Sequence, residues 1–229
     1  MTFRVVIPIF NDVTQLDFTG PAQLFAKVPD VDLCIASKDA RAVQTDSGFA
    51  VAAPYTFADC PPADLICVPG GGGIMDAIRD PCFLSFVERQ CSGARYVTSV
   101  CTGMFALGAL GLVEGRKVTT HWGYTDVIAD CGGIFTRGRV VIDGNLITAG
   151  GVTSGIDFGL TVITHVFGEP IARLIQLAMQ YDPQPPFASG HPDQAQPETR
   201  AAANTIYIER AHQMREALRD AAGSDAPSR

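Results

Sequence analysis

The chain has 229 residues, of which 47% are hydrophobic and 18% are charged. At roughly 100 to 200 residues per domain, this length favours one globular domain with a substantial core. The 17 basic and 24 acidic residues leave a net charge of −7. Because the sequence has no strong basic cluster to attract phosphates, we expect no nucleic-acid partner.

No apolar segment approaches the roughly 18 residues that a membrane-spanning helix requires, so we expect no membrane contact. The N-terminus enters a strand-like segment directly, without the pattern of a signal peptide. The seven cysteines include no C-x-x-C pair and no Cys/His spacing typical of a zinc site. These features predict a cytoplasmic protein with free thiols and no bound metal.

Short β-branched segments alternate with helical patterns along the first half of the chain. This alternation predicts an α/β fold whose central sheet is mostly parallel and buried on both faces. The predicted strands cover residues 3–10, 31–37, 64–69 and 94–100, and the predicted helices cover residues 19–27, 81–91 and 104–110.

The second half of the chain departs from this alternation around Asp143-Gly144. Two apolar segments flank this dipeptide within residues 139–148, which predicts an inserted β-hairpin. The remaining expected elements are helices at 155–167, 170–181 and 201–222 and a proline-rich loop at 182–197. We expect a domain over residues 1–190, an extension over residues 191–222 whose helix packs on the domain or on a dimer partner, and a disordered tail over residues 223–229.

Cys101 stands where the strand at 94–100 turns into a helix, with Gly103 two residues later. This resembles the nucleophile elbow G-x-S-x-G, with a thiol in place of the hydroxyl and Ser99 in place of the first glycine. Unpaired backbone N–H groups and the positive end of the helix dipole favour an anion there, which predicts a reactive thiolate. The alternative is a buried cysteine at a tight junction. The other six cysteines are expected to be packing residues.

A run of four glycines, residues 70–73, ends another predicted strand at the same edge of the sheet. Its backbone can approach a ligand closely, so the N–H groups of Gly71 and Thr102 are candidates for an oxyanion hole, with Gly72 beside them in the substrate pocket. The alternative is a flexible turn. A phosphate-binding loop is disfavoured because no Gly-Lys-Ser/Thr follows.

A nucleophilic cysteine needs a partner that moves protons, and histidine, its usual partner, does not follow it here. A carboxylate is the other choice, and Asp17 is the candidate because it lies amid apolar residues in the loop after the first strand. The alternative role for Asp17 is helix capping, although Thr19 is better placed for that role. His121 and Trp122 follow a predicted strand at 116–120, so they point either to the same edge of the sheet or into a packed junction.

The Asp17 loop and residues 68–71 (VPGG), 97–103 (VTSVCTG) and 117–122 (KVTTHW) resemble the DJ-1/PfpI superfamily. Within it the chain most resembles the isocyanide hydratases, through residues 15–21 (QLDFTGP), 57–62 (FADCPP) and 181–187 (YDPQPPF). The resemblance implies a flavodoxin-like sandwich similar to class I glutamine amidotransferases, a homodimer, and no metal or organic cofactor. It places the catalytic cysteine on Cys101 and the catalytic aspartate on Asp17.

The resemblance further implies that water adds to an isocyanide, R–N≡C, to give an N-substituted formamide. We expect the Cys101 thiolate to attack the terminal carbon while protonated Asp17 delivers a proton to it, which gives a covalent thioimidate. Asp17 then activates water, and the adduct expels the sulfur. The candidates for the pocket around this small neutral substrate are Phe18, His121, Trp122 and Val152, and we expect the segment at Val152 to adjust when the sulfur changes charge.

Other functions stay open, because a fold does not fix a reaction. An accessible cysteine of low pKa also suits a ligand sensor or a redox sensor. AraC-type regulators carry a similar domain, but the roughly 40 residues that follow it here are too few for two DNA-reading motifs. A glyoxalase-like or deglycase-like enzyme is a further alternative. Asp17 stands where such members usually have glutamate, and Thr102 stands where the peptidases have histidine, and both differences count against those activities.

Overall fold

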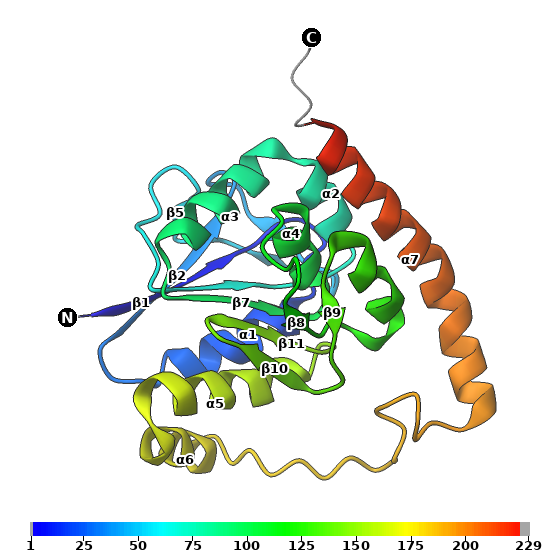
Figure 1. Cartoon of the computed structure of the whole chain (residues 1–229). Helices are drawn as coiled ribbons and strands as arrows, with labels where there is room; N and C mark the ends of the chain where they lie inside the picture. Colours follow the sequence, from blue (N-terminus) through cyan, green and yellow to red (C-terminus); the bar gives the residue numbers. More distant parts are fainter. Residues whose placement is uncertain (1, 225–229) are drawn as a thin grey trace.

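The computed structural model describes residues 2–224 and is built around one seven-stranded sheet (Figure 1). The strands lie in the order β10-β11-β7-β6-β1-β2-β5. They span β1 Phe3–Pro8, β2 Val31–Ser37, β5 Tyr55–Thr56, β6 Leu65–Val68, β7 Tyr96–Val100, β10 Val140–Asp143 and β11 Leu146–Ala149. Every neighbouring pair is parallel except β10 with β11. The predicted α/β fold with a mostly parallel sheet is therefore confirmed.

Helices cover both faces of the sheet (Figure 1). One face carries α1 (Gln15–Phe25), α5 (Ser154–Phe167) and α6 (Glu169–Ala178). The other carries α2 (Ile74–Arg79), α3 (Pro81–Gly93), α4 (Met104–Ala109), the 3₁₀ segment η2 (Trp122–Cys131) and the long α7 (Pro197–Ser224). Two small ribbons complete the fold, β3 (Val43–Gln44) with β4 (Ala50–Val51) and β8 (Lys117–Val118) with β9 (Ile134–Phe135).

The hydrophobic core forms two layers, one on each face of the sheet. Phe25 and Phe158 meet edge to face under α1 and α5, with ring centroids 6.3 Å apart. Phe57 stacks on Phe86 in the other layer, at 4.3 Å. All four residues of β6 are buried, as a central parallel strand covered on both faces requires. No helix within residues 2–224 is both long and apolar enough to cross a membrane.

Helix α1 begins four residues before the predicted start at residue 19. Thr14 takes the N-cap position in an extended conformation, and the Thr19 hydroxyl donates to Gln15 Oε1 at 2.9 Å, so Thr19 does not cap the helix. Pro21 lies inside the helix, where it removes only the hydrogen bond that an N–H would donate to the Asp17 carbonyl. Asp17 consequently belongs to the first turn of α1, and its predicted place in a loop was wrong.

The predicted hairpin is confirmed, but its turn lies one residue later. Asp143 pairs with Leu146, so Gly144 and Asn145 are the central residues. Gly144 has a φ of 59°, and glycine with positive φ at the first central position is typical of a type II′ turn. Strand β11 also pairs in parallel with β7, so the hairpin forms the edge of the main sheet.

The C-terminal part follows the predicted pattern of loop and helix. Residues 182–196 form no helix or strand, and the boundary proposed at residue 190 falls within them. Helix α7 is longer than predicted and reaches Ser224. It packs on α2, α4 and η2, along the side of the molecule (Figure 1). The division into domains stays a prediction, and residues 225–229 of the expected tail lie outside the described residues.

The turn between β7 and α4 requires glycine at position 103. A Cβ atom on Gly103 would lie 2.1 Å from the carbonyl oxygen of Val68 and 2.7 Å from that of Pro69. Both oxygens belong to the backbone at the end of the neighbouring strand β6, which cannot move without disturbing the sheet. Gly103 therefore lets the strand ends of β6 and β7 approach each other.

We expect Gly103→Ala to lower the free energy of unfolding by at least about 2 kcal/mol, because the added methyl group overlaps backbone oxygens. Urea-induced unfolding followed by far-UV circular dichroism measures this loss. Gly93→Ala is the matched control, since a Cβ on Gly93 meets no atom within 4 Å, and its effect should stay within about 0.5 kcal/mol. Equal stability of the two variants would contradict the packing argument.

Candidate active site

Several loops meet at the carboxyl edge of the sheet, where open α/β folds bind their ligands. They follow β1, β6, β7 and β11. A hollow of about 380 Å³ opens between them. Its floor includes Gly71, Gly72, Cys101 and Thr102, and Val152 lies on its wall. The sequence-predicted residues Cys101, Thr102, Gly71, Gly72 and Val152 are thus brought to one place.

Cys101 has a backbone conformation that non-glycine residues rarely adopt, with a φ of 57°. Its N–H donates to the carbonyl of Gly150 at 2.9 Å, and its own carbonyl accepts the Thr120 hydroxyl at 2.8 Å. These bonds hold the residue in a strained turn between β7 and the 3₁₀ segment η1 (Cys101–Gly103). This geometry agrees with the predicted nucleophile elbow.

The Cys101 side chain is only 5% exposed but lies at the floor of the hollow. Burial raises the pKa of the Cys101 thiol well above its usual value, and the charge of Asp17 raises it further. The backbone N–H groups of Thr102 and Val152 lower it by a smaller amount. The sequence predicted a thiolate at this position, but burial favours the neutral thiol in the free protein, because the loss of solvent outweighs the two N–H donors.

Asp17 is fully buried, and its carboxyl group interacts with the Cys101 thiol. Its Oδ2 atom accepts the N–H of Gly70 at 3.0 Å, whereas Oδ1 has no hydrogen-bond partner among the described residues. Burial raises the pKa of Asp17 to about 7, although the Gly70 N–H and the Cys101 thiol both lower it. Near neutral pH this carboxyl group can therefore either donate or accept a proton.

The protonation states of Asp17 and Cys101 depend on each other. The charge of Asp17 raises the pKa of the thiol, whereas the thiol lowers the pKa of the carboxyl group. With one proton between them, the pair exists either as thiol and carboxylate or as thiolate and carboxylic acid. The second form combines a nucleophile with an acid. A buried pair of this kind can attack a carbon atom and protonate it in the same step.

The glycine loop presses against the segment that precedes α1. The Thr14 N–H donates to the Gly70 carbonyl at 3.0 Å, and Val13 forms an isolated antiparallel bridge with Gly71. Gly71 has a φ of 139°, and a Cβ atom there would lie 2.4 Å from the Thr14 nitrogen. Glycine at this position therefore allows the contact that fixes Asp17 relative to the end of β6.

The two predicted oxyanion donors differ in their surroundings. The Thr102 N–H interacts with the Cys101 sulfur, as expected for a donor beside the nucleophile. The Gly71 N–H donates to Thr102 Oγ1 at 3.1 Å. It can donate to a bound substrate only if this hydrogen bond breaks or is shared. Val152 supplies the second N–H near the sulfur, a contact that the sequence analysis did not predict.

The other predicted pocket residues, His121, Trp122 and Phe18, lie in different places in the structure. His121 lines the hollow, and burial lowers its pKa to about 4, so it is uncharged near neutral pH. Its Nδ1 atom accepts the N–H of Gly123 at 3.2 Å. Trp122 lines neighbouring hollows instead of the one at Cys101. Phe18 is 3% exposed and packs in the core beneath the sheet, so it does not line the hollow.

Several residues of the hollow were not foreseen. These further lining residues are Asp12, Thr14, Asp46, Tyr124, Tyr207 and Arg210. Tyr207 and Arg210 belong to α7, about a hundred residues after Cys101 in the chain. No local pattern marks them, because their role depends on where α7 packs.

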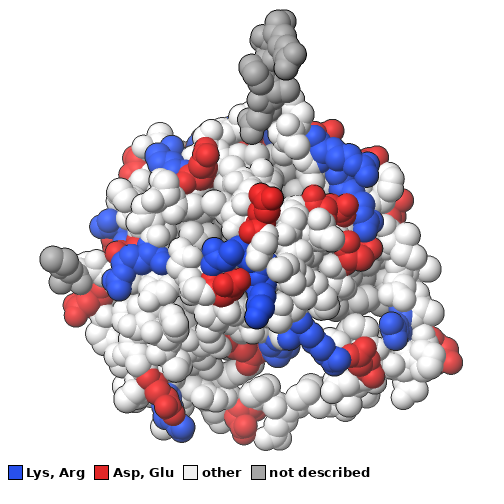
Figure 2. All heavy atoms as spheres, in the orientation of Figure 1, with Lys and Arg blue, Asp and Glu red and all other residues white. Residues whose placement is uncertain are grey.

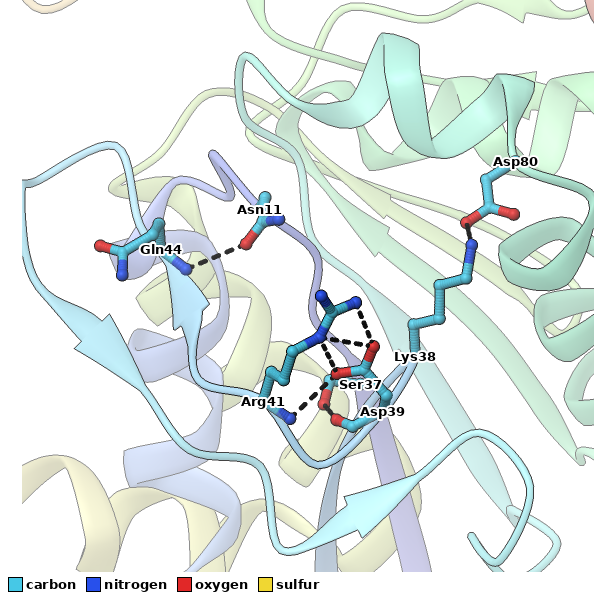
Figure 3. Close-up of polar contacts among 7 residues, drawn as sticks. All are labelled: Asn11, Ser37, Lys38, Asp39, Arg41, Gln44 and Asp80. Carbon is cyan, nitrogen blue, oxygen red and sulfur yellow. Dashed lines mark hydrogen bonds and ion pairs between the residues drawn. The ribbon is translucent and has the colours of Figure 1, made fainter.

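A second hollow of about 510 Å³ is lined by Asp12 and Gly72 among others, and Figure 3 shows polar contacts among seven of its lining residues. Both of its basic side chains are paired: Lys38 contacts Asp80 at 2.6 Å, and Arg41 binds both carboxylate oxygens of Asp39. It contains no cysteine or histidine. Among residues 2–224 no group of three or more His, Cys, Asp or Glu side chains is arranged to hold a metal ion. The hollow at Cys101 is therefore the candidate active site.

Known proteins resemble this chain in sequence and in fold. The sequence is 46% identical to the isonitrile hydratase of Pseudomonas putida over 195 residues, which cover 85% of this chain and 86% of that protein. The fold matches the crystal structure of a ThiJ/PfpI family protein from Pseudomonas syringae with a TM-score of 0.92 and 34% identity, over 95% of this chain and 91% of the other. Oxidised DJ-1 of Toxoplasma gondii shares the fold at a TM-score of 0.71 and 20% identity, over 80% of this chain and all of that one.

The family profile described as the DJ-1/PfpI family matches residues 3–165. These residues contain the predicted sheet, the elbow at Cys101 and the buried carboxyl of Asp17. The chain therefore belongs to the DJ-1/PfpI family.

Proposed function

We propose that this protein is an isocyanide hydratase, which adds water to R–N≡C and releases the formamide R–NH–CHO. The observation that carries the proposal is the buried Asp17 carboxyl beside the Cys101 sulfur at the floor of the hollow. The relative from Pseudomonas putida, similar over most of both chains, is named an isonitrile hydratase.

The first step uses the pair in its thiolate and carboxylic acid form. The Cys101 sulfur bonds to the terminal carbon, and the Asp17 proton passes to the same carbon, which gives the thioimidate R–N=CH–S–Cys101 and leaves Asp17 as carboxylate. Proton transfer matters here because sulfur addition alone would place an electron pair on carbon in a site from which water is largely excluded. The raised pKa of Asp17 keeps the required proton available near neutral pH.

The second step consumes water. Asp17 as carboxylate takes a proton from the attacking water and passes it to the substrate nitrogen, which forms R–NH–CH(OH)–S–Cys101. Collapse of this adduct breaks the carbon–sulfur bond, returns the hydroxyl proton to Asp17 and releases the formamide. The pair regains the single proton with which it began. The N–H groups of Thr102 and Val152, which interact with the sulfur, favour it as the leaving thiolate.

A redox or ligand sensor is less well supported by the same observations. Oxidation requires an accessible thiolate, whereas the Cys101 side chain is 5% exposed and burial raises its pKa. For a glyoxalase-like or deglycase-like enzyme, the sequence departs from the usual pattern at Asp17. Lactate formation from methylglyoxal would favour that alternative.

We expect Cys101→Ala to abolish formamide production, because the covalent route is lost. General acid–base help contributes about 10²- to 10⁴-fold, so Asp17→Asn should raise the barrier by roughly 3 to 5 kcal/mol. Chromatographic assay of the formamide from cyclohexyl isocyanide measures both effects, and mass spectrometry of the protein detects the thioimidate. Cys82→Ala, at an exposed cysteine, is the control and should keep full activity. Turnover by Cys101→Ala at the wild-type rate would refute the mechanism.

The shared proton also predicts the pH dependence. Below the Asp17 pKa of about 7 the pair binds a second proton and loses its nucleophile, so kcat/KM should rise with pH through about 7 and fall only under alkaline conditions. Initial rates between about pH 5 and 9 test this expectation. Asp17→Asn should lose the acidic limb. A wild-type profile that stays flat below pH 7 would contradict the assigned proton.

The protein is further proposed to act as a cytoplasmic homodimer. The seven cysteines are all free thiols, which suits a reducing compartment. Helix α6 carries two strongly exposed leucines, Leu174 at 67% and Leu177 at 79%, and Phe187 in the segment that follows is 77% exposed. Strongly exposed apolar side chains on one helix are consistent with a surface covered by a partner.

We expect sedimentation equilibrium to give the mass of two chains, and Leu177→Glu to shift the protein toward one chain because a charge would enter the interface. Ile208→Glu is the control, since Ile208 is 70% exposed on α7, away from α6. A wild-type mass of one chain would contradict the proposed dimer.

A further inference from the structure

Helix α7 completes the Cys101 hollow from outside the residues that match the family profile. The profile covers residues 3–165, whereas Tyr207 and Arg210 lie on α7 and line the hollow. The proposed chemistry at Cys101 and Asp17 uses neither side chain. Because they line the hollow, they can contact the part of a bound substrate that lies away from Cys101.

The position of α7 is fixed on its C-terminal side. Ala211, Met214 and Ala217 are buried in the core layer above the sheet. Arg215 binds Asp126 at 2.8 Å and Asp130 at 2.9 Å, both in η2. Tyr207 and Arg210 lie just before this anchored part of the helix, so the fold holds them at a defined place beside the hollow.

Tyr207 forms an aromatic wall with residues of η2 and its N-cap. Its ring centroid lies 4.7 Å from that of His121, 4.9 Å from that of Trp122 and 5.8 Å from that of Tyr124. Gly123 makes room for the ring, because a Cβ atom there would lie 2.5 Å from Tyr207 Cγ. The rings meet Tyr207 at interplanar angles of 41° to 71° and together form an aromatic lining that can contact a planar or aliphatic substituent.

Arg210 is the cationic residue of this wall. Burial raises the pKa of the Tyr124 hydroxyl group, whereas the charge of Arg210 lowers it by a smaller amount, so the two side chains lie close together. Basic and acidic side chains lie next to one another along α7 (Figure 2). The ion pairs of α7 within the described chain use Asp220, His212 and Arg215, and none of them uses Arg210. A guanidinium group carries five N–H donors, so Arg210 retains donors for an incoming anion.

Two acidic residues, Asp46 and Asp12, also line the hollow. The Asp46 oxygens accept the Thr14 hydroxyl at 2.6 Å and the Gln15 N–H at 3.3 Å, so both already have donors. An anionic group would be repelled by these carboxylates and attracted to Arg210, so we expect it to face Arg210.

We propose that Arg210 selects isocyanides whose substituent carries an anionic group such as a carboxylate, with the substituent resting on the Tyr207 wall. This inference rests on the proposed hydratase function and deepens it by naming the substrate class. The isocyanide carbon would meet Cys101 while the carboxylate takes the free N–H donors of Arg210. Arg210 thus acts as a specificity residue and takes no part in the bond changes.

The test compares 4-isocyanobenzoate with its neutral methyl ester. Because Arg210 is exposed and solvent screens its charge, we expect the ratio of kcat/KM values, acid over ester, to fall about three- to tenfold in Arg210→Gln. The loss should appear in KM for the acid. Arg210→Lys should keep most of the preference, and added salt should reduce it in the wild type. Arg219→Gln on the same helix, at an exposed position, is the matched control and should leave the ratio unchanged.

A binding measurement makes the test independent of turnover. Trp122 is the single tryptophan of the chain and lies beside Tyr207, so its fluorescence should report occupation of the wall. In the Cys101→Ala background, 4-formamidobenzoate should bind more tightly than its methyl ester, and adding Arg210→Gln should remove that difference.

The possible outcomes separate the two proposals. If neither isocyanide yields formamide, the hydratase function fails, while the fluorescence titration still decides the role of Arg210. If the ester is hydrated but the acid-to-ester ratio and the binding difference are the same with and without Arg210→Gln, the inference about Arg210 is overturned and the hydratase function stands.

Discussion

The contact between the Asp17 carboxyl and the Cys101 sulfur is the interaction on which the rest of the site depends. Both groups are buried, so the charged form of each is disfavoured, and the protonation of one group depends on that of the other. Burial raises the pKa of Asp17 from 3.8 to about 7. The neutral carboxyl therefore contributes stability that is fully present below pH 3.8 and is lost as the pH rises through about 7. At neutral pH part of this contribution to stability is lost, while Asp17 still keeps an exchangeable proton beside the nucleophile.

The fold holds this unfavourable pair together through contacts between strand ends. Gly103 lets the end of β7 lie against that of β6, and Gly71 lets the end of β6 lie against the start of α1. Cys101 remains at positive φ because hydrogen bonds to Gly150 and Thr120 hold its backbone on both sides. A parallel sheet allows this arrangement, because the carboxyl ends of its strands lie at one edge and the loops that follow them can surround the Cys101 sulfur.

The layout also separates chemistry from recognition. The nucleophile and the N–H donors come from strand ends and the acid from the first turn of α1, all within the part of the chain that matches the family profile. The aromatic wall includes Tyr207 of α7, which lies beyond that part. The charged residues of the hollow divide in the same way, because Asp12 and Asp46 belong to the matched part and Arg210 belongs to α7. Substrate choice can therefore change through α7 without disturbing the strained turn at Cys101.

The sequence by itself determined the parallel sheet, the elbow at Cys101 and the choice of Asp17, because strand, turn and helix signals are local and their order places the strand ends at one edge. It misplaced the start of α1, since the end that begins at Thr14 is fixed by contact with Gly70, far along the chain. Only the tertiary structure decided which groups are charged, because burial, not helix position, dominates the pKa of Cys101. It alone brought Tyr207 and Arg210 to the site, since the packing of a distant helix leaves no local pattern in the sequence.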